Sequence, residues 1–411
     1  MKNLRDRNLS IIPIMAGLSL GVMNVALLSP ALPAIKEYYH IAVSQSQFVV
    51  IIFLGGYAVS QLSFGAIAKK FGYQKSMFLG IMTGAIGSFI CIYSSYSGSF
   101  FMLMTGRFIE GFGTSCGLAL GFAIINELYI GKAVRDITTY GLMGLAFIAA
   151  FSSYIGGFLT SNYSWISCFY FLTACNILTA FSCFLLSRSL DAKKKSLFSN
   201  KRIICSYLLA FRNKKLILGS IIYGLFLAII YLTIALLPFI GIRDLHLSPE
   251  KFGFFFLLSY LGYFIGTILT RFSTGRLNAN ASILLGMSIT ITGGFIFFIS
   301  AFSLELNMSI IFSSIFISLI GIAFIFVNIS SMAISSHRDK ANGSAVFNFI
   351  YSLFALFSVV LPQFIDSKFE LILPSVTIIA TILGFCIYIK FAGLRIPYLK
   401  RMRNLLMVSE H

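Results

Sequence analysis

Twelve long apolar runs constrain this chain more than any other feature of its sequence. They cover residues 11–35, 47–68, 76–97, 100–125, 138–161, 165–187, 216–240, 252–270, 281–302, 308–333, 343–365 and 371–392. A helix that crosses the hydrocarbon core of a bilayer needs roughly 20 apolar residues. Only 11% of the 411 residues are charged, so a soluble globule could not stay dispersed with 58% hydrophobic residues. The sequence therefore predicts an all-α integral membrane protein with twelve transmembrane helices.

Lysine and arginine are concentrated in every second segment between these runs, and therefore on one side of the predicted membrane. If the N-terminus is cytoplasmic, 26 of the 31 Lys and Arg residues fall in cytoplasmic segments and four in outer segments. Cytoplasmic segments of membrane proteins carry such an excess of positive charge. We therefore expect both termini in the cytoplasm. The net charge of +18 is interpreted as orienting charge, because nucleic-acid binding needs cations gathered on one folded face.

A basic polar stretch divides the runs into two sets of six. We expect an N-terminal six-helix bundle at 1–187, a cytoplasmic linker at 188–215, a C-terminal bundle at 216–395 and a cytoplasmic tail at 396–411. The two halves show a weak sequence repeat, since Ser44 precedes Phe48 by four residues and Ser248 precedes Phe252 by four residues. Both serines suit a helix N-cap. Paired six-helix repeats predict a substrate site at their interface, reached alternately from the two sides.

Two ionisable residues stand inside the fourth run, where charge is costly. Arg107 and Glu110 lie about 10 and 15 Å deep if the helix enters near Phe100, at about 1.5 Å per residue. Charges at that depth face a protein interior or a water-filled cavity. Three residues apart, they share a helix face and can neutralise each other as a structural pair. The functional alternative is that Glu110 carries a coupling proton, since burial favours its neutral form and Arg107 its charged form.

Glycines recur at four-residue spacing later in the same run. Gly113, Gly117 and Gly121 leave a strip on which a second helix can approach closely, as membrane helices require. We expect these glycines to serve helix packing.

Several motifs together resemble the major facilitator superfamily, and within it the twelve-span drug:proton antiporters of the bicyclomycin and chloramphenicol exporter type. Residues 30–33 read Pro-Ala-Leu-Pro, as at the end of the first helix in that group. Residues 107–113 are similar to the Arg-x-x-Gln-Gly-x-Gly motif, with Glu110 at the Gln position. The double glycine Gly156-Gly157 is similar to the end of the antiport motif, but Ser152 and Ser153 replace its Gly-Pro. The usual acidic residue of the first helix is replaced by Ala26.

The segment after the second run resembles the family's cytoplasmic gate motif. The residues that match it by position are Gly65, Lys69, Lys70, Gly72 and Lys75. Lys69 stands where the family has Asp, so the role of that acid does not carry over. The alternative is that these lysines only orient the helix.

The resemblance implies a secondary active transporter of the bacterial cytoplasmic membrane that exports a small organic molecule in exchange for protons. We expect Arg107 and Glu110 to couple the proton. The candidate substrate-binding residues are Asn24, Tyr57, Gln61, Arg107, Glu110, Tyr231 and Asn328, with Tyr223, Tyr260, Tyr263 and Asn348 as further polar lining of the second half. Packing or an interface belt is the alternative for each tyrosine.

The remaining expectations concern partners and rival functions. The seven cysteines have no metal-ligand or redox spacing, and no phosphate-cradling motif occurs. We therefore expect no cofactor, no metal and no enzymatic activity. The expected partners are a small-molecule substrate, protons and membrane lipids, with no nucleic acid and a monomeric protein. The rival functions are export of one metabolite such as a siderophore, import of a nutrient, and a non-transporting membrane receptor.

Overall fold

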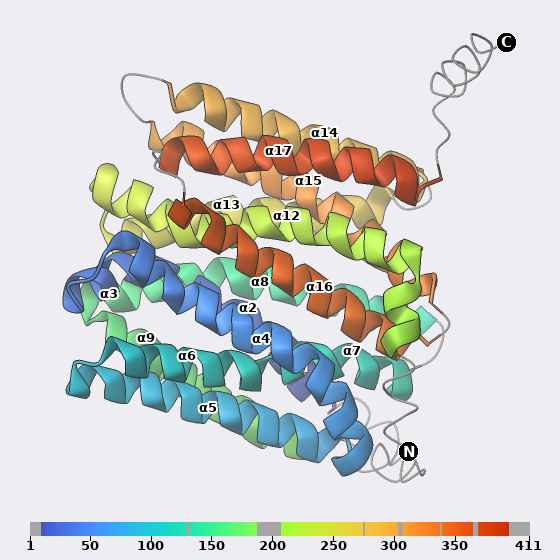
Figure 1. The fold of residues 1–411 in the computed structure, drawn as a ribbon, viewed down its shortest axis with the longest axis horizontal. Coiled ribbons are helices and arrows are strands. Elements are labelled where there is room, and N and C mark those ends of the chain that lie inside the picture. Colours follow the sequence, from blue (N-terminus) through green and yellow to red (C-terminus); the bar gives the residue numbers. More distant parts are fainter. Residues whose placement is uncertain are drawn as a thin grey trace, which may run out of the picture.

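The structure is a computed structural model. It describes residues 10–129, 132–186, 207–273, 276–302, 307–337, 339–364 and 369–393. Most of the expected linker at 188–215 and all of the expected tail at 396–411 lie outside the described residues. Figure 1 shows long helices lying side by side along one common direction, without a separate soluble domain among the parts drawn as ribbons.

The described residues form helices almost throughout. Those of the first half are α2 (Ile11–Ala26), η1 (Ser29–Ala31), α3 (Leu32–Tyr38), α4 (Val43–Phe71), α5 (Tyr73–Ser97), α6 (Phe100–Thr114), α7 (Cys116–Leu128), α8 (Lys132–Asn162), α9 (Trp165–Ser182) and η2 (Cys183–Leu185). Those of the second half are α12 (Lys214–Pro238), η3 (Phe239–Asp244), α13 (Pro249–Ser273), α14 (Ala279–Ser300), α15 (Met308–Ser335), α16 (Lys340–Val360), η4 (Leu361–Phe364) and α17 (Phe369–Phe391).

Twelve helical segments among the described residues are long and apolar enough to cross a membrane, which confirms the predicted number of spans. Two of them are interrupted. The first span breaks after Ala26 and continues through η1 and α3, where Pro30 and Pro33 lack the N–H groups that a continuous helix needs. The fourth span breaks at Ser115, between α6 and α7.

Polar groups at the helix ends show where the expected caps fall. Helix α13 begins at Pro249, and the Ser248 hydroxyl accepts a hydrogen bond from the N–H of Lys251, as expected for an N-cap. The prediction for Ser44 is wrong, because α4 begins at Val43, one residue before Ser44. There the side chain of Gln45 accepts from the N–H of Ala42, so the preceding residue is the cap.

The helices pack first within each half of the chain and then across the halves. In the first half α5 lies against α6 and α9, α4 against α6, and α2 against α7 and α8. In the second half α14 lies against α15 and α17, α12 against α16 and α17, and α13 against α15. Two long seams join the halves, one between α8 and α13 and the other between α4 and α16.

The halves meet closely at the end of the molecule that holds η1 and η3. The Ser29 hydroxyl donates to the carbonyl of Ile234 at 2.8 Å, and the Ser161 hydroxyl accepts from the N–H of Glu250 at 3.0 Å. Each bond joins one half to the other. This end is therefore tied by hydrogen bonds as well as by apolar packing.

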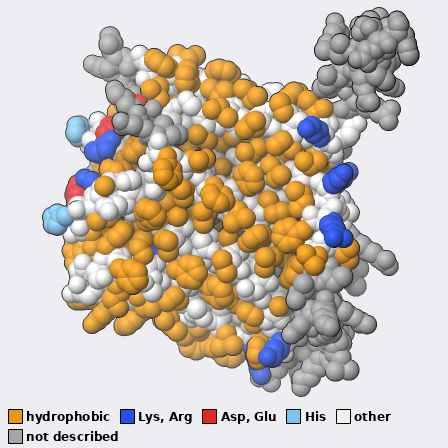
Figure 2. Space-filling view, viewed as in Figure 1, with side chains coloured by type: hydrophobic (Ala, Val, Ile, Leu, Met, Phe, Trp, Pro, Cys, Tyr) orange, Lys and Arg blue, Asp and Glu red, His pale blue; other side chains and the backbone are white. Residues whose placement is uncertain are grey.

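The surface of the molecule is divided into an apolar band and two charged ends. Figure 2 shows hydrophobic side chains over the middle, Lys and Arg along the right-hand edge, and charges of both signs with histidines at the left. The right-hand edge is the end at which α2 begins (Figure 1). This separation matches the excess of Lys and Arg on one side of the predicted spans.

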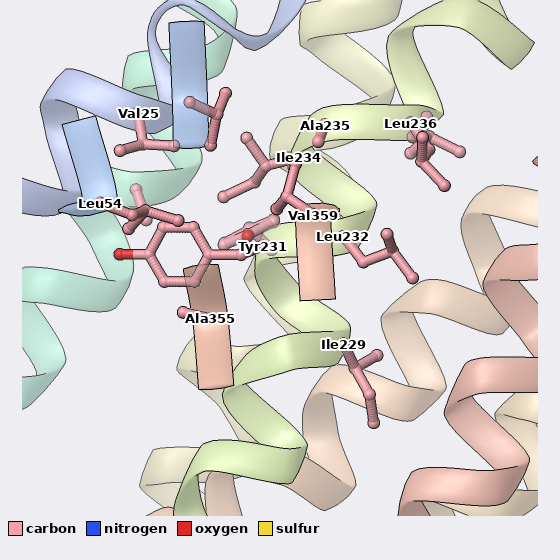
Figure 3. Packing of buried hydrophobic residues seen from close by; sticks show 14 of the residues in the cluster. Val25, Leu54, Ile229, Tyr231, Leu232, Ile234, Ala235, Leu236, Ala355 and Val359 are labelled. Atoms are coloured by element: carbon pink, nitrogen blue, oxygen red, sulfur yellow. The ribbon is translucent and has the colours of Figure 1, made fainter. Parts of the chain in front are cut away.

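The apolar core continues across the junction between the halves. Figure 3 shows Tyr231 of α12 reaching toward Leu54 of α4, with Ala355 and Val359 of α16 beside it. All four are buried and belong to one cluster that includes residues of both halves. Helices of the two halves therefore share a core at the centre of the molecule.

Two glycines provide a matched test of close helix approach. A Cβ at Gly117 of α7 would collide with the backbone of Gly17 on α2, whereas one at Gly144 of α8 would meet nothing within 4 Å. We expect Gly117→Ala to destabilise the protein by about 1–3 kcal/mol through overpacking. Gly144→Ala should be neutral or stabilising by up to about 1 kcal/mol, because alanine favours helix. Thermal unfolding in detergent measures both, and equal melting temperatures would contradict the packing at Gly117.

Candidate functional site

Arg107 is completely buried inside the first half, with 0% exposure. Its Nη1 donates to Glu110 Oε2 at 2.5 Å, and its Nε donates to the carbonyl of Val49 on α4 at 3.0 Å. Its Nη2 reaches the carbonyl of Asn24 on α2 at 3.4 Å. The guanidinium carbon lies 4.4 Å from the ring centre of Phe53, a cation–π distance. Arg107 of α6 thus joins three helices through one side chain.

Glu110 has 0% exposure and is held from two sides. One carboxylate oxygen accepts from Arg107 and the other from the Ser88 hydroxyl of α5. Ser88 in turn accepts a hydrogen bond from the Asn176 side chain of α9 at 3.1 Å. A chain of polar groups therefore crosses the first bundle from α9 through α5 and α6 to α4 and α2.

This arrangement neutralises the charge where it is buried. A carboxylate and a guanidinium in contact, with hydrogen bonds to their remaining atoms, avoid most of the penalty of burying each charge alone. Gly87 makes the approach possible, because a Cβ there would collide with the backbone of Glu110. The pair lies among helices of the first bundle rather than at the seams with the second half.

A second group of polar side chains lies at the junction of the halves. Tyr57 of α4 and Tyr231 of α12 are both buried and belong to the apolar cluster that spans the two halves. Tyr260 of α13 belongs to the same cluster, and Tyr263 packs against it. The structure therefore brings the sequence-predicted Tyr57 and Tyr231 together from opposite halves.

Aromatic contacts extend this tyrosine group within the second half. The ring of Tyr223 stacks on Phe326 with centres 3.9 Å apart and lies 4.9 Å from the ring of Tyr351. The ring of Tyr263 contacts Phe326 from another side, at 6.1 Å. We call Tyr57, Tyr223, Tyr231, Tyr260, Tyr263 and Tyr351 the junction tyrosines.

Among the buried polar groups without a hydrogen-bond partner in the described residues, two belong to the junction tyrosines or lie beside them. They are the hydroxyl of Tyr260, which is 3% exposed, and the side-chain nitrogen of Gln61, which is 0% exposed. The oxygen of Gln61 accepts from Asn348 of α16 at 3.3 Å, across the halves. Buried polar groups are almost always paired in folded proteins. The two unpaired groups are therefore the strongest sign of a ligand at this junction.

Two asparagines expected to line the substrate site are occupied otherwise. The side-chain nitrogen of Asn24 donates to Leu20 of its own helix, and its backbone carbonyl accepts from Arg107. The side-chain nitrogen of Asn328 donates to Phe324 of its own helix at 2.8 Å. The Asn24 side-chain oxygen is buried without a partner among the described residues, so Asn24 joins the Arg107–Glu110 network through its backbone alone.

The expected gate motif forms the corner between α4 and α5. Gly72 separates the two helices with φ of 86°, a value that favours glycine. Lys70 and Lys75 are exposed, while the side chain of Lys69 lies outside the described residues. The Tyr207 hydroxyl donates to the carbonyl of Leu62 at 3.2 Å and sits where a Cβ on Gly65 would collide.

Tyr207 lies in the described last part of the expected linker, just before the second half begins. Burial, together with the Asp339 carboxylate nearby, raises the pKa of the Tyr207 hydroxyl. It therefore stays protonated and can donate at neutral pH. Asn213, at the end of the same segment, donates to the carbonyl of Ser336 at 3.0 Å. This segment thus contacts helix α4 of one half and the end of α15 of the other.

The other glycines singled out in the sequence also lie at helix contacts. Gly113 faces Gly84 of α5, Gly121 faces Leu18 of α2, and Gly156 faces the carbonyl of Leu27. Gly157 of α8 faces the carbonyl of Pro249 at the start of α13, so this contact joins the two halves.

Sequence reasoning missed Ser88 and Asn176, the two side chains that complete the Glu110 network. Both are polar residues inside apolar spans, and that position was the available signal. Among the described residues, no three His, Cys, Asp or Glu side chains gather as metal ligands.

Comparison with solved structures supports the fold described above. The structure of the xylose transporter XylE from Escherichia coli, in a partially occluded inward-open conformation, superposes with a TM-score of 0.70. It covers 92% of this chain and 97% of its own at 12% identity, so it shows the fold alone. The predicted fold class is confirmed.

Curated relatives share parts of the sequence. An uncharacterised transporter of Rickettsia bellii is 29% identical over 60% of this chain and 61% of its own length. The alignment thus spans less than two thirds of that relative. The chloramphenicol resistance protein CraA of Acinetobacter baumannii is 28% identical over 71% of each chain. A bicyclomycin resistance protein homolog of Haemophilus influenzae is 23% identical over 67% of this chain and 71% of its own.

Residues 14–362 match the sequence profile of the Major Facilitator Superfamily. This family consists of transporters, which confirms that the chain is not an enzyme. With a match over more than half of its length, the chain belongs to the Major Facilitator Superfamily.

Proposed function

We propose that this protein exports a small organic molecule across the bacterial cytoplasmic membrane by alternating access, driven by proton entry. Family membership supports transport, and the similarity to two drug-resistance proteins supports export as the direction. The excess of Lys and Arg at one end supports placing both termini in the cytoplasm. The bundles comprise 1–187 and 216–395, and the protein acts as a monomer.

The junction tyrosines form the substrate site in this proposal. The observation that carries it is the pair of buried, unpartnered groups on opposite halves, the Tyr260 hydroxyl and the Gln61 amide nitrogen. A substrate with hydrogen-bonding groups would satisfy both, and its release would leave them free for the next cycle. Because Tyr57 and Tyr231 come from different halves, separation of the halves opens the site.

The cargo is an uncharged molecule with an aromatic or other flat apolar part. Tyrosine rings offer stacking surfaces without fixed charge, which suits ligands of varied shape. The two charged side chains at similar depth, Arg107 and Glu110, are committed to each other inside the first bundle. A cationic or anionic cargo would meet no opposite charge from this pair.

Glu110 carries the coupling proton in this proposal. When its carboxylate takes a proton, Arg107 loses its ionic partner but keeps its contacts with Val49 and Asn24. The guanidinium also rests on Phe53, whose ring centre is 6.0 Å from that of Tyr57. A change in the pair therefore acts on α4, the helix that carries Tyr57 and Gln61 to the junction. Ser88 and Asn176 position the carboxylate.

The direct test is transport into everted membrane vesicles, with and without a pH gradient. The wild-type protein should accumulate an uncharged aromatic probe only when the inside is acidic, and should release protons as it does so. Glu110→Gln keeps the size and one hydrogen-bonding oxygen, so it should lose proton-driven accumulation while retaining probe exchange between equilibrated compartments.

Two outcomes would contradict this account in distinguishable ways. Undiminished proton exchange by Glu110→Gln would remove Glu110 from the coupling but leave export intact. Absence of any probe movement by the wild-type protein, with cationic dyes moved instead, would overturn the substrate site. Glu250→Gln, in the half-buried first turn of α13, is the matched control and should behave as wild type.

A double-mutant cycle tests how much the ion pair contributes to the stability of the fold. Removing one partner of a buried pair leaves an uncompensated charge and costs about 3–5 kcal/mol. We expect Arg107→Met and Glu110→Met to lower thermal stability strongly and the double variant to recover much of the loss. A double variant whose loss equals the sum of the single losses would show that the two side chains act independently.

A further inference from the structure

An apolar pocket of about 430 Å³ lies between α2 and α8, away from the junction tyrosines. Its lining includes Ile11, Met15 and Ser19 of α2 and Ile137, Gly144 and Ile148 of α8. The Ser19 hydroxyl donates a hydrogen bond to the carbonyl of Met15, so it leaves the pocket wall apolar. The volume falls within the range of ligand sites, roughly 300–1,000 Å³.

The pocket opens toward the exposed side of α8, on the lateral surface of the helix bundle. Tyr140, which lines it, begins a stripe of exposed side chains on α8 that continues through Phe147, Phe151 and Phe158. These positions recur at seven and four residues and therefore share one helix face. Gly144 lies one turn from Tyr140 beside this stripe.

The neighbouring helix also indicates which face of the molecule contacts lipid. Helix α13, packed along α8, exposes Phe254, Ile265 and Leu269 in a stripe of its own, while Tyr260 is buried toward the junction. The two exposed stripes adjoin, since the ring of Phe147 lies 6.3 Å from that of Phe264 on α13. In a twelve-span protein, such a continuous exposed apolar face is the one that contacts lipid.

A cation lies at the mouth of the pocket. The guanidinium of Arg271, in the last turn of α13, lies 5.4 Å from the ring centre of Tyr140. Arg271 is exposed and sits at the end of the molecule where α2 and α8 begin. An apolar pocket with a cation at its membrane-surface end matches a molecule with an acyl chain and an anionic head.

We propose that this pocket binds one acyl chain of an anionic phospholipid from the cytoplasmic leaflet, with the lipid phosphate beside Arg271. The pocket lies between α2 and α8 of the first half, whereas Arg271 beside its mouth belongs to α13 of the second half. A bound lipid would therefore connect the two halves at the cytoplasmic end of the seam between α8 and α13. The proposal stands whether or not the protein exports an organic molecule.

The test is lipid retention measured by native mass spectrometry. The protein is purified from vesicles that contain equal parts of phosphatidylglycerol and phosphatidylcholine. The wild-type protein should retain one phosphatidylglycerol per chain. Arg271→Gln should weaken the preference for phosphatidylglycerol about fivefold, the effect of one cation near a membrane surface. Gly144→Phe places a ring in open space within the pocket and should abolish retention of either lipid.

Two matched controls separate the site from general effects. Arg276→Gln removes another exposed cation near the same end, and Phe158→Leu alters the exposed stripe outside the pocket. Both should retain lipid as the wild type does. Wild-type retention and headgroup preference in both Gly144→Phe and Arg271→Gln would overturn the proposal. If Gly144→Phe fails to fold, Arg271→Gln decides alone, because it changes only an exposed side chain.

Discussion

The hydrocarbon interior of a bilayer offers no hydrogen-bond partner, and this constraint governs the whole structure. Each backbone group must be satisfied within its own segment, so the chain crosses as helices. Hydroxyls inside the spans bond back to their own helices, as Thr233 does to Ile229 and Thr381 to Thr377. The same constraint draws Arg107 and Glu110 together. At the junction of the halves, the Tyr260 hydroxyl and the Gln61 side-chain nitrogen depart from this pairing.

Close helix contacts decide where the structure is rigid and where it can separate. Gly113, Gly117 and Gly156 bring backbones together inside the first half, and lipid provides no hydrophobic force that would replace such packing. Between the halves, contacts concentrate along α8 with α13 and α4 with α16. Gly157 and Gly253 bring α8 and α13 to backbone distance at one end of their seam. We infer that each bundle moves as a unit and that the seams are where it pivots.

The number of spans and the fold class followed from hydropathy, because length and composition alone determine whether a helix can cross a bilayer. Helix ends were less predictable: Ala42 rather than Ser44 is the N-cap of α4, because the helix begins two residues earlier than expected. The breaks at Ala26 and Ser115 depend on local backbone geometry that an apolar run does not record.

The candidate site was predictable only in part. The depth of Arg107 and Glu110 indicated a buried pair, but not the direction in which it faces. That direction depends on α5 and α9, which supply Ser88, 22 residues before Glu110, and Asn176, 88 residues after Ser88. Tyr57 and Tyr231 were chosen individually, and only the packing of the two halves brings them together. Asn328 was expected at the site as well, but its side-chain nitrogen is bonded to its own helix.

The proposed function requires the halves to pivot about their seams, and so to open the site at the junction tyrosines, when Glu110 takes up a proton. The most direct measurement is the distance between spin labels across the halves at both ends, at alkaline and acidic pH. One pair replaces the exposed Glu37 and His246, and the other replaces the exposed Lys75 and Arg276. Acidification should lengthen one distance and shorten the other, and Glu110→Gln should abolish the response. Two distances that stay fixed or change in the same direction would contradict the claim.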